Sequence, residues 1–168
     1  MKTLKIISAL IFLLILSTNT FAQHQHKAHL DSLVTHYLSA KEALANDNFE
    51  GAHQHLARLK TEATSSAEMN HHPEHAEMHA KHHGAMVAAV TEAEQAENLD
   101  QLRAAFHKVS QNLIKAVRNQ GYDETLHIQY CPMASNGEGA SWMSSSKEIA
   151  NPYMGQKMPS CGTTQDTL

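Results

Sequence analysis

Sulfur-bearing side chains gather in the last third of the chain, over residues 130–162. This stretch contains both cysteines and four of the eight methionines, on a background rich in Gly, Ser, Pro and Asn. Thiolates and thioethers are soft donors, which select Cu(I) over hard ions such as Mg²⁺. A Cys-Pro-Met sequence near the start and a Met-Pro-Ser-Cys sequence near the end are close to mirror images. Brought together, they predict a soft-metal site of two to four sulfur ligands, drawn from Cys131, Met133, Met158 and Cys161.

The two cysteines have a second interpretation, which is a disulfide. Cys131 and Cys161 lie thirty positions apart in the sequence, and exported domains commonly carry such bonds. A disulfide would stabilise a loop-rich lobe by about 2–4 kcal/mol. It would also leave no thiolate for a metal, so the two interpretations exclude each other and the residues alone leave both open. The methionines likewise have an ordinary role as flexible core residues.

A second candidate site is the histidine-rich segment HHPEHAEMHAKHH at residues 71–83, which holds six of the fourteen histidines. At about 100° per residue, four of these histidines fall on one side of a helix: His75, His79, His82 and His83. Side chains four residues apart are neighbours on a helix, and neutral imidazole suits Cu(II), Zn²⁺ and Ni²⁺. The segment therefore predicts a zinc or nickel site. A solvated face that captures metals weakly is the alternative.

Four amphipathic segments are expected to position these residues. Apolar side chains recur every three or four positions in each, which is typical of helices, over about residues 28–45, 49–61, 73–97 and 99–119. Gly121 is placed to close the last helix as a C-terminal cap. Short connections predict an antiparallel up-and-down four-helix bundle, and hence an all-α fold with an irregular Cys/Met-rich C-terminal lobe. Within that lobe, the alternating sequence TLHIQY at 125–130 predicts one short strand.

Residues 1–22 are expected to be a signal peptide, because a short basic start precedes an apolar run and small residues at the cleavage point. That run is too short to span a bilayer, which takes about 20 residues. We therefore expect a periplasmic or otherwise exported protein with no membrane insertion after signal removal. One domain is expected, with the bundle and its His-rich segment at 23–122 and the loop-rich lobe packed on it at 123–168.

Charge and motifs argue against two functional classes. The formal net charge is −4 with neutral histidines, and no basic patch appears, so nucleic acid is not expected as a partner. Neither a Ser-His-Asp arrangement, an HExxH helix nor a paired-carboxylate motif appears, so an enzyme is not expected. The mildly acidic charge instead favours attraction of cations.

The tail also carries a resemblance. The strings CPMA (131–134), EIANPYMG (148–155) and CG (161–162), with Trp142 between the first two, are similar to the domain-of-unknown-function family 3347. Members occur as exported proteins and fused to periplasmic adaptor subunits of copper/silver efflux systems. The resemblance implies a helical domain with a copper-linked role, and an efflux adaptor or another envelope protein as partner. It also implies that four tail residues shape the loop rather than bind a ligand, namely Asn151, Pro152, Tyr153 and Gly155.

Three functional hypotheses are compatible with these residues. The first is an exported soft-metal (copper-type) binding protein, with Cu(I) favoured at the Cys/Met site, that buffers metal or hands it to an efflux system. The second is a disulfide-stapled helical interaction module of the cell envelope without a metal of its own. The third is a zinc or nickel scavenger that uses only histidines.

Overall fold

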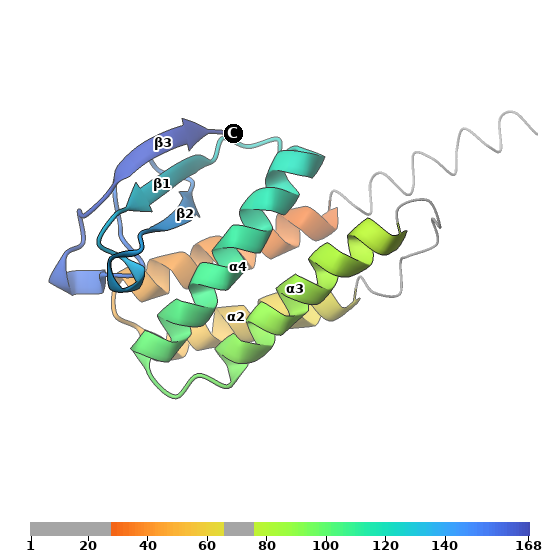
Figure 1. The fold of residues 1–168 in the computed structure, drawn as a ribbon, viewed down its shortest axis with the longest axis horizontal. Coiled ribbons are helices and arrows are strands. Elements are labelled where there is room, and N and C mark those ends of the chain that lie inside the picture. The colour runs from red at the N-terminus through yellow and green to blue at the C-terminus, as the bar shows by residue number, and fades with distance from the viewer. Residues whose placement is uncertain (1–27, 66–75) are drawn as a thin grey trace, which may run out of the picture.

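Residues 28–65 and 76–168 are described by a computed structural model, and the side chains of residues 76–83 lie outside the description. The first part of the fold is helical: a helix over residues 28–45, then α2 (Phe49–Ser65), α3 (Ala76–Glu94) and α4 (Leu99–Gln120). Successive helices run in opposite directions (Figure 1). The prediction of four helices is therefore confirmed, and α2 extends one turn further than its sequence pattern indicated. The predicted signal peptide lies outside the described residues.

Helix α4 shows how local sequence fixes an element. The Asn98 side chain accepts a hydrogen bond from the Gln101 N–H at 3.0 Å, which satisfies one of the free amides at the helix start. At the other end Gly121 adopts φ 77° and donates its N–H to the Val117 carbonyl, a conformation that glycine adopts without steric cost. The predicted cap is confirmed, and it turns the chain toward the C-terminal lobe.

The prediction of an all-α fold is wrong. The C-terminal lobe is not irregular but contains a three-stranded antiparallel sheet in the order β2-β1-β3. The strands are β1 (His127–Cys131), β2 (Ala140–Ser144) and β3 (Thr163–Thr167). In Figure 1 this sheet lies beside α4 at one flank of the helices. The fold is therefore a helical bundle with a small sheet attached.

Only the central strand carried a readable sequence signal. The alternation in TLHIQY anticipated β1 to within two residues, but β2 buries Trp142 and Met143 in succession, and β3 reads TTQDT with no apolar residue. Both edge strands depend on pairing with β1, in which Cys131 lies opposite Ala140 and Tyr130 opposite Thr163. Strand formation reflects such cross-strand contacts more than local preference, so the pattern of a single segment could not reveal them.

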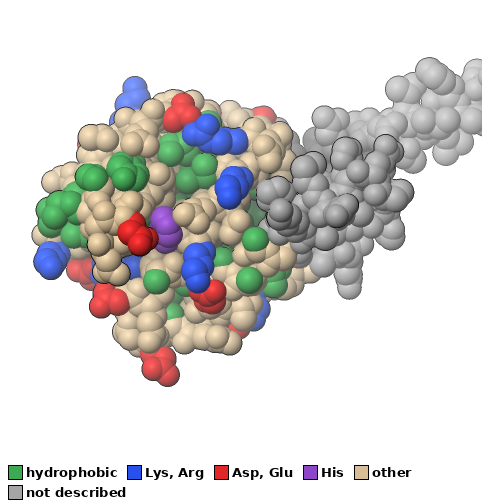
Figure 2. All heavy atoms as spheres, in the orientation of Figure 1, with side chains coloured by type: hydrophobic (Ala, Val, Ile, Leu, Met, Phe, Trp, Pro, Cys, Tyr) green, Lys and Arg blue, Asp and Glu red, His purple; other side chains and the backbone are tan. Residues whose placement is uncertain are grey.

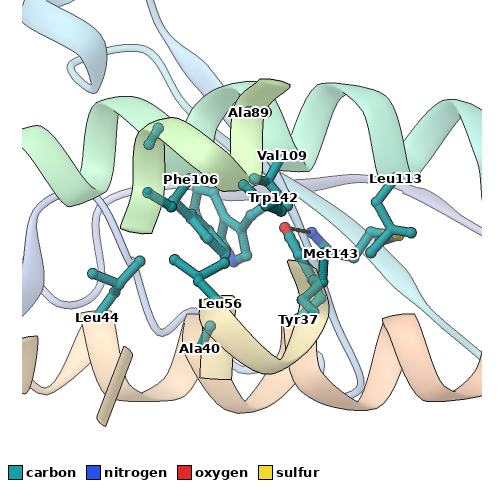
Figure 3. Close-up of a cluster of buried hydrophobic side chains, with 14 of the residues drawn as sticks. Tyr37, Ala40, Leu44, Leu56, Ala89, Phe106, Val109, Leu113, Trp142 and Met143 are labelled. Carbon is teal, nitrogen blue, oxygen red and sulfur yellow. Dashed lines mark hydrogen bonds between the residues drawn. The ribbon is translucent and has the colours of Figure 1, made fainter. Parts of the chain in front are cut away.

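The sheet and the helices share one hydrophobic core. Tyr37 stacks on Phe106 with ring centres 4.9 Å apart, and Trp142 and Met143 of β2 reach into the same cluster (Figure 3). All four side chains have no exposed surface. Trp142 and Met143 therefore join the sheet to the helical core.

Charged side chains of both signs are interspersed on the face seen in Figure 2. Lys60 pairs with Glu94 and Lys108 with Glu92, each joining α3 to a neighbouring helix. Exposed pairs of this kind stabilise a fold by about 0–1 kcal/mol each, so they orient the helices rather than hold them together. Among the described residues, no helix is both long and apolar enough to cross a membrane.

Candidate functional site: the disulfide-bridged tail

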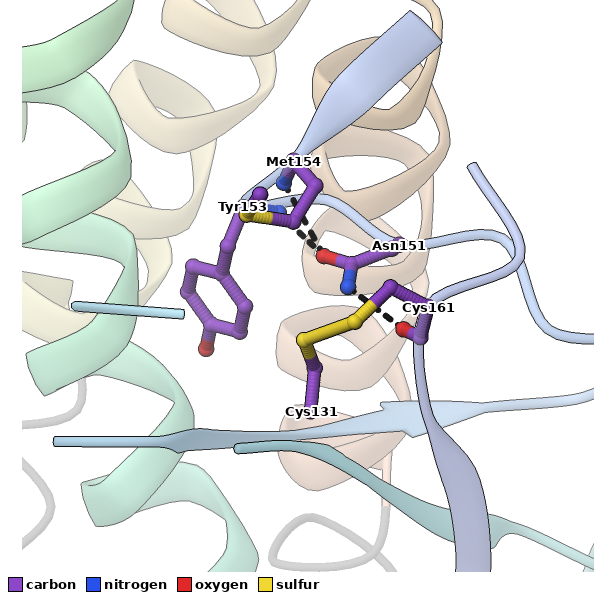
Figure 4. Close-up of a disulfide and its surroundings, with 5 residues drawn as sticks. All are labelled: Cys131, Asn151, Tyr153, Met154 and Cys161. Carbon is purple, nitrogen blue, oxygen red and sulfur yellow. Dashed lines mark hydrogen bonds between the residues drawn. A yellow bond between two sulfur atoms is a disulfide. The ribbon is translucent and has the colours of Figure 1, made fainter. Parts of the chain in front are cut away.

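Cys131 and Cys161 are joined by a disulfide, with Cα atoms 5.8 Å apart (Figure 4). Strand β1 ends at Cys131, and Cys161 lies two residues before β3, which pairs with β1. The sheet thus brings both cysteines to one end, within the Cα range that a disulfide requires. Of the two interpretations that the sequence left open, the structure contains the disulfide.

Asn151 fixes the backbone around the second cysteine. Its side-chain Nδ2 donates to the Cys161 carbonyl at 2.6 Å, and its Oδ1 accepts the backbone N–H groups of Tyr153 and Met154. Its own N–H donates to the Pro159 carbonyl at 2.9 Å. The residue is fully buried, so these bonds satisfy polar groups that water cannot reach. Asn151 therefore ties the Asn-Pro-Tyr turn to the disulfide.

A buried network of hydroxyl groups connects the tail to the helices. The Tyr37 hydroxyl shares a 2.8 Å hydrogen bond with Ser110 Oγ and accepts the Met143 N–H at 3.0 Å. The Tyr153 hydroxyl lies 3.1 Å from the same Ser110 Oγ and donates to the Ser141 carbonyl. Burial raises the pKa of both phenols well above the ordinary value. Both phenols therefore stay neutral at physiological pH. They act as structural hydrogen-bonding groups and not as bases.

A second contact clamps the tail onto the connection between the first two helices. Arg103 donates to the Pro152 carbonyl at 2.9 Å, to the Leu44 carbonyl at 3.1 Å and to the Asp47 carboxylate. The Arg103 guanidinium holds the pKa of Asp47 below its usual range. Gly155 lies against this pair with φ 54°, and any Cβ at that position would collide with Asp47 and Arg103. Only glycine therefore fits this point of the turn.

The methionines of the predicted soft-metal site are not equivalent. Met133 is 54% exposed, and among the described residues it is the only large hydrophobic side chain that is exposed. Met158 is half-buried in the turn before Cys161, whose N–H donates to the Met158 carbonyl at 3.2 Å. Met154 is also half-buried and packs against the core. The structure thus brings the two cysteines together, whereas the Met133 side chain is exposed to solvent.

The side chains of the predicted histidine site lie outside the description. His75 lies outside the described residues, and His79, His82 and His83 belong to α3 with side chains outside the description. Downstream on the same helix, Met86 and Val90 are buried in the core. Within the part of the chain whose side chains are described, no group of three or more His, Cys, Asp or Glu residues is placed to hold a metal ion.

Several residues that shape the site gave no recognisable signal in the sequence. Arg103, Asp47 and Ser110 act through partners more than 40 positions away. Their roles depend on which face of each helix packs against the tail. The spacing of hydrophobic residues does not specify this packing. Asn151 and Gly155 could be singled out only through the resemblance of the Asn-Pro-Tyr-Met-Gly string.

A family model described as "Protein of unknown function (DUF3347)" matches residues 33–125. The chain belongs to this family. The DUF3347 match covers more than half of the chain and ends just before β1, so it rests on the helices. The tail, whose motifs suggested the family, lies beyond the matched residues. No match was found among curated proteins or among solved structures.

Proposed function

We propose that this DUF3347 protein is a disulfide-stapled helical interaction module of the cell envelope. The observation that carries the proposal is the Cys131–Cys161 disulfide, which joins the end of β1 to the segment before β3. Disulfides persist in oxidising compartments outside the cytoplasm, in agreement with the signal-like sequence of residues 1–22. In this form the cysteines are structural and offer no thiolate.

Met133 marks where such a module would contact its partner. It is exposed and lies two residues after Cys131, so the disulfide restrains the turn that presents it. Methionine is adaptable in shape and is favoured at protein-binding surfaces. The partner would be another envelope protein, with a heavy-metal efflux adaptor as the candidate that the family resemblance supports.

A site-specific crosslinking experiment tests this proposal. A photoreactive residue at position 133 is expected to capture one discrete envelope protein in living cells. The matched control carries the same residue at Lys157, an exposed position of the same lobe, and is expected to capture none. The same products from both positions, or none from position 133, would contradict the proposal.

Soft-metal buffering is a second candidate, favoured by the closeness of the two cysteines. A dithiol reductant would reduce the bond to two thiols, itself becoming a disulfide, and would leave two cysteines whose Cα atoms start 5.8 Å apart. Two thiolates with a nearby thioether from Met158 or Met133 would suit Cu(I), and binding would release the two thiol protons. Metal could then be passed to an efflux system, with the histidine segment collecting ions.

A Cu(I) competition titration against a chromophoric chelator separates the two candidates. Soft-metal buffering predicts that the reduced protein competes strongly, while the oxidised protein and the Cys131→Ala/Cys161→Ala variant do not. Equal competition by all three samples would rule out a metal role for the tail. Loss of binding only after replacement of the histidines in the segment at 71–83 would instead favour the histidine-based scavenger.

A further inference from the structure

Two histidines from different helices lie next to each other. His36 belongs to the helix over residues 28–45 and His55 to α2, and their ring centres are 6.0 Å apart at an interplanar angle of 37°. The Nδ1 atom of each ring is buried and has no hydrogen-bond partner among the described residues. Buried polar atoms are normally satisfied, so the orphaned nitrogens of these two neighbouring rings indicate a missing partner.

We infer that His36 and His55 form a two-histidine binding site for a divalent transition-metal ion, which bridges the first two helices. This inference goes beyond the proposed interaction role and involves neither the tail cysteines nor the histidine segment at 71–83. Imidazole nitrogen is a ligand that Zn²⁺, Cu²⁺ and Ni²⁺ all accept.

The spacing of the rings suits one shared ion. A metal about 2.0–2.1 Å from a nitrogen of each ring places the ring centres roughly 5–6 Å apart at ordinary ligand angles. The observed 6.0 Å therefore needs only a small inward adjustment of the side chains. Both residues are half-buried, and water would supply the remaining ligands.

Arg58 lies three residues after His55 on α2, and its positive charge acts on the His55 ring. That charge opposes a bound cation, so we expect an exchangeable ion rather than a permanently held one.

The helix register supports a built site rather than a chance encounter. His29 and Glu62 form a second cross-helix pair 3.9 Å apart. They lie seven residues from His36 and His55 respectively, in opposite directions along the two antiparallel helices. Seven residues are about two helical turns, or about 10.5 Å. The two pairs therefore lie along one seam between the antiparallel helices, about 10.5 Å apart.

Residue-resolved carbethoxylation of histidines, read by mass spectrometry, tests the site in the full mature chain. Free Zn²⁺ is set with a chelator buffer, so that uptake by other histidines does not change its concentration. We expect His36 and His55 to become protected together, with the same midpoint. His53, whose Nε2 lies 2.9 Å from the Glu94 carbonyl oxygen, is the control and should show no midpoint there.

A variant then decides whether one ion is shared. Because groups beyond the direct ligands alone change metal affinity by about 10–100-fold, His36→Gln should raise the midpoint for His55 by at least about tenfold. The matched His53→Gln variant should leave it unchanged. Unprotected His36 and His55 in the natural protein, different midpoints for the two residues, or unchanged protection of His55 in His36→Gln would each overturn the inference.

Discussion

Removing the Cys131–Cys161 disulfide should cost the protein a large part of its stability. The bond closes a loop between residues separated by 30 positions, and cross-linking a loop of that size restricts the unfolded chain. The chain-entropy relation gives about 3.7 kcal/mol for it at 25 °C. Since domains of this size are stable by about 5–15 kcal/mol in total, the reduced protein should remain folded but marginal.

Urea denaturation of the natural protein with and without reductant measures this loss directly. We expect the free energy of unfolding to fall by about 3–4 kcal/mol on reduction, with a melting temperature lower by about 10 °C. The Cys131→Ala/Cys161→Ala variant is the matched control, because reductant should not change its unfolding curve. A loss below about 1 kcal/mol in the natural protein would refute the claim that the bond is a staple.

Three further substitutions test the contacts that hold the tail. Gly155→Ala should destabilise the protein by about 1–3 kcal/mol, because of its positive φ and the collision with Asp47 and Arg103. Gly84→Ala, in an exposed helical position with no atom near the added Cβ, should instead stabilise it by about 0.5–1 kcal/mol, and equal effects in urea titrations would contradict the steric argument. The lowered pKa of Asp47 means that its ionised form stabilises the fold above the ordinary pKa of 3.8, and that this contribution disappears as the pH falls through the lower folded value. Asp47→Asn should therefore flatten the acid side of a stability–pH profile, and an unchanged profile would show that the Arg103 pair contributes nothing. Tyr37→Phe removes the hydroxyl that joins the helices to β2 and should cost about 1–3 kcal/mol by leaving buried groups unpaired; calorimetry showing no change would mean that the network is not structural.

The helices could be predicted from the sequence because each carries its own signal. Spacing of apolar residues located all four, and Gly121 marked the end of α4 as observed. These features depend on residues within a few turns of one another. The same spacing could not show that Tyr37 and Ser110, 73 positions apart, share a hydrogen bond.

The C-terminal lobe was predicted less well because its structure depends on long-range pairing. Strand β3 forms by pairing with β1, which lies more than 30 positions away, and its polar sequence resembles a loop. The many glycines and prolines of the tail favoured irregular backbone, yet they serve the turns between strands. The cysteines could be recognised as the centre of the lobe, but only the sheet register shows that they meet.

The His36–His55 pair illustrates a third limit. Neither residue belongs to a recognisable motif, and the predicted histidine site was the dense segment at 71–83. Their contact depends on the register between two antiparallel helices, which no local pattern specifies. The orphaned ring nitrogens become visible only once the helices are packed.

The central claim is that the tail cysteines are a structural pair, and counting thiols tests it most directly. Protein purified from its native compartment without reductant would be denatured, alkylated and analysed by mass spectrometry. We predict no alkylated cysteine and one linked peptide pair containing Cys131 and Cys161. Two alkylated cysteines, with no linked peptide, would contradict the disulfide and restore the cysteines as candidate metal ligands.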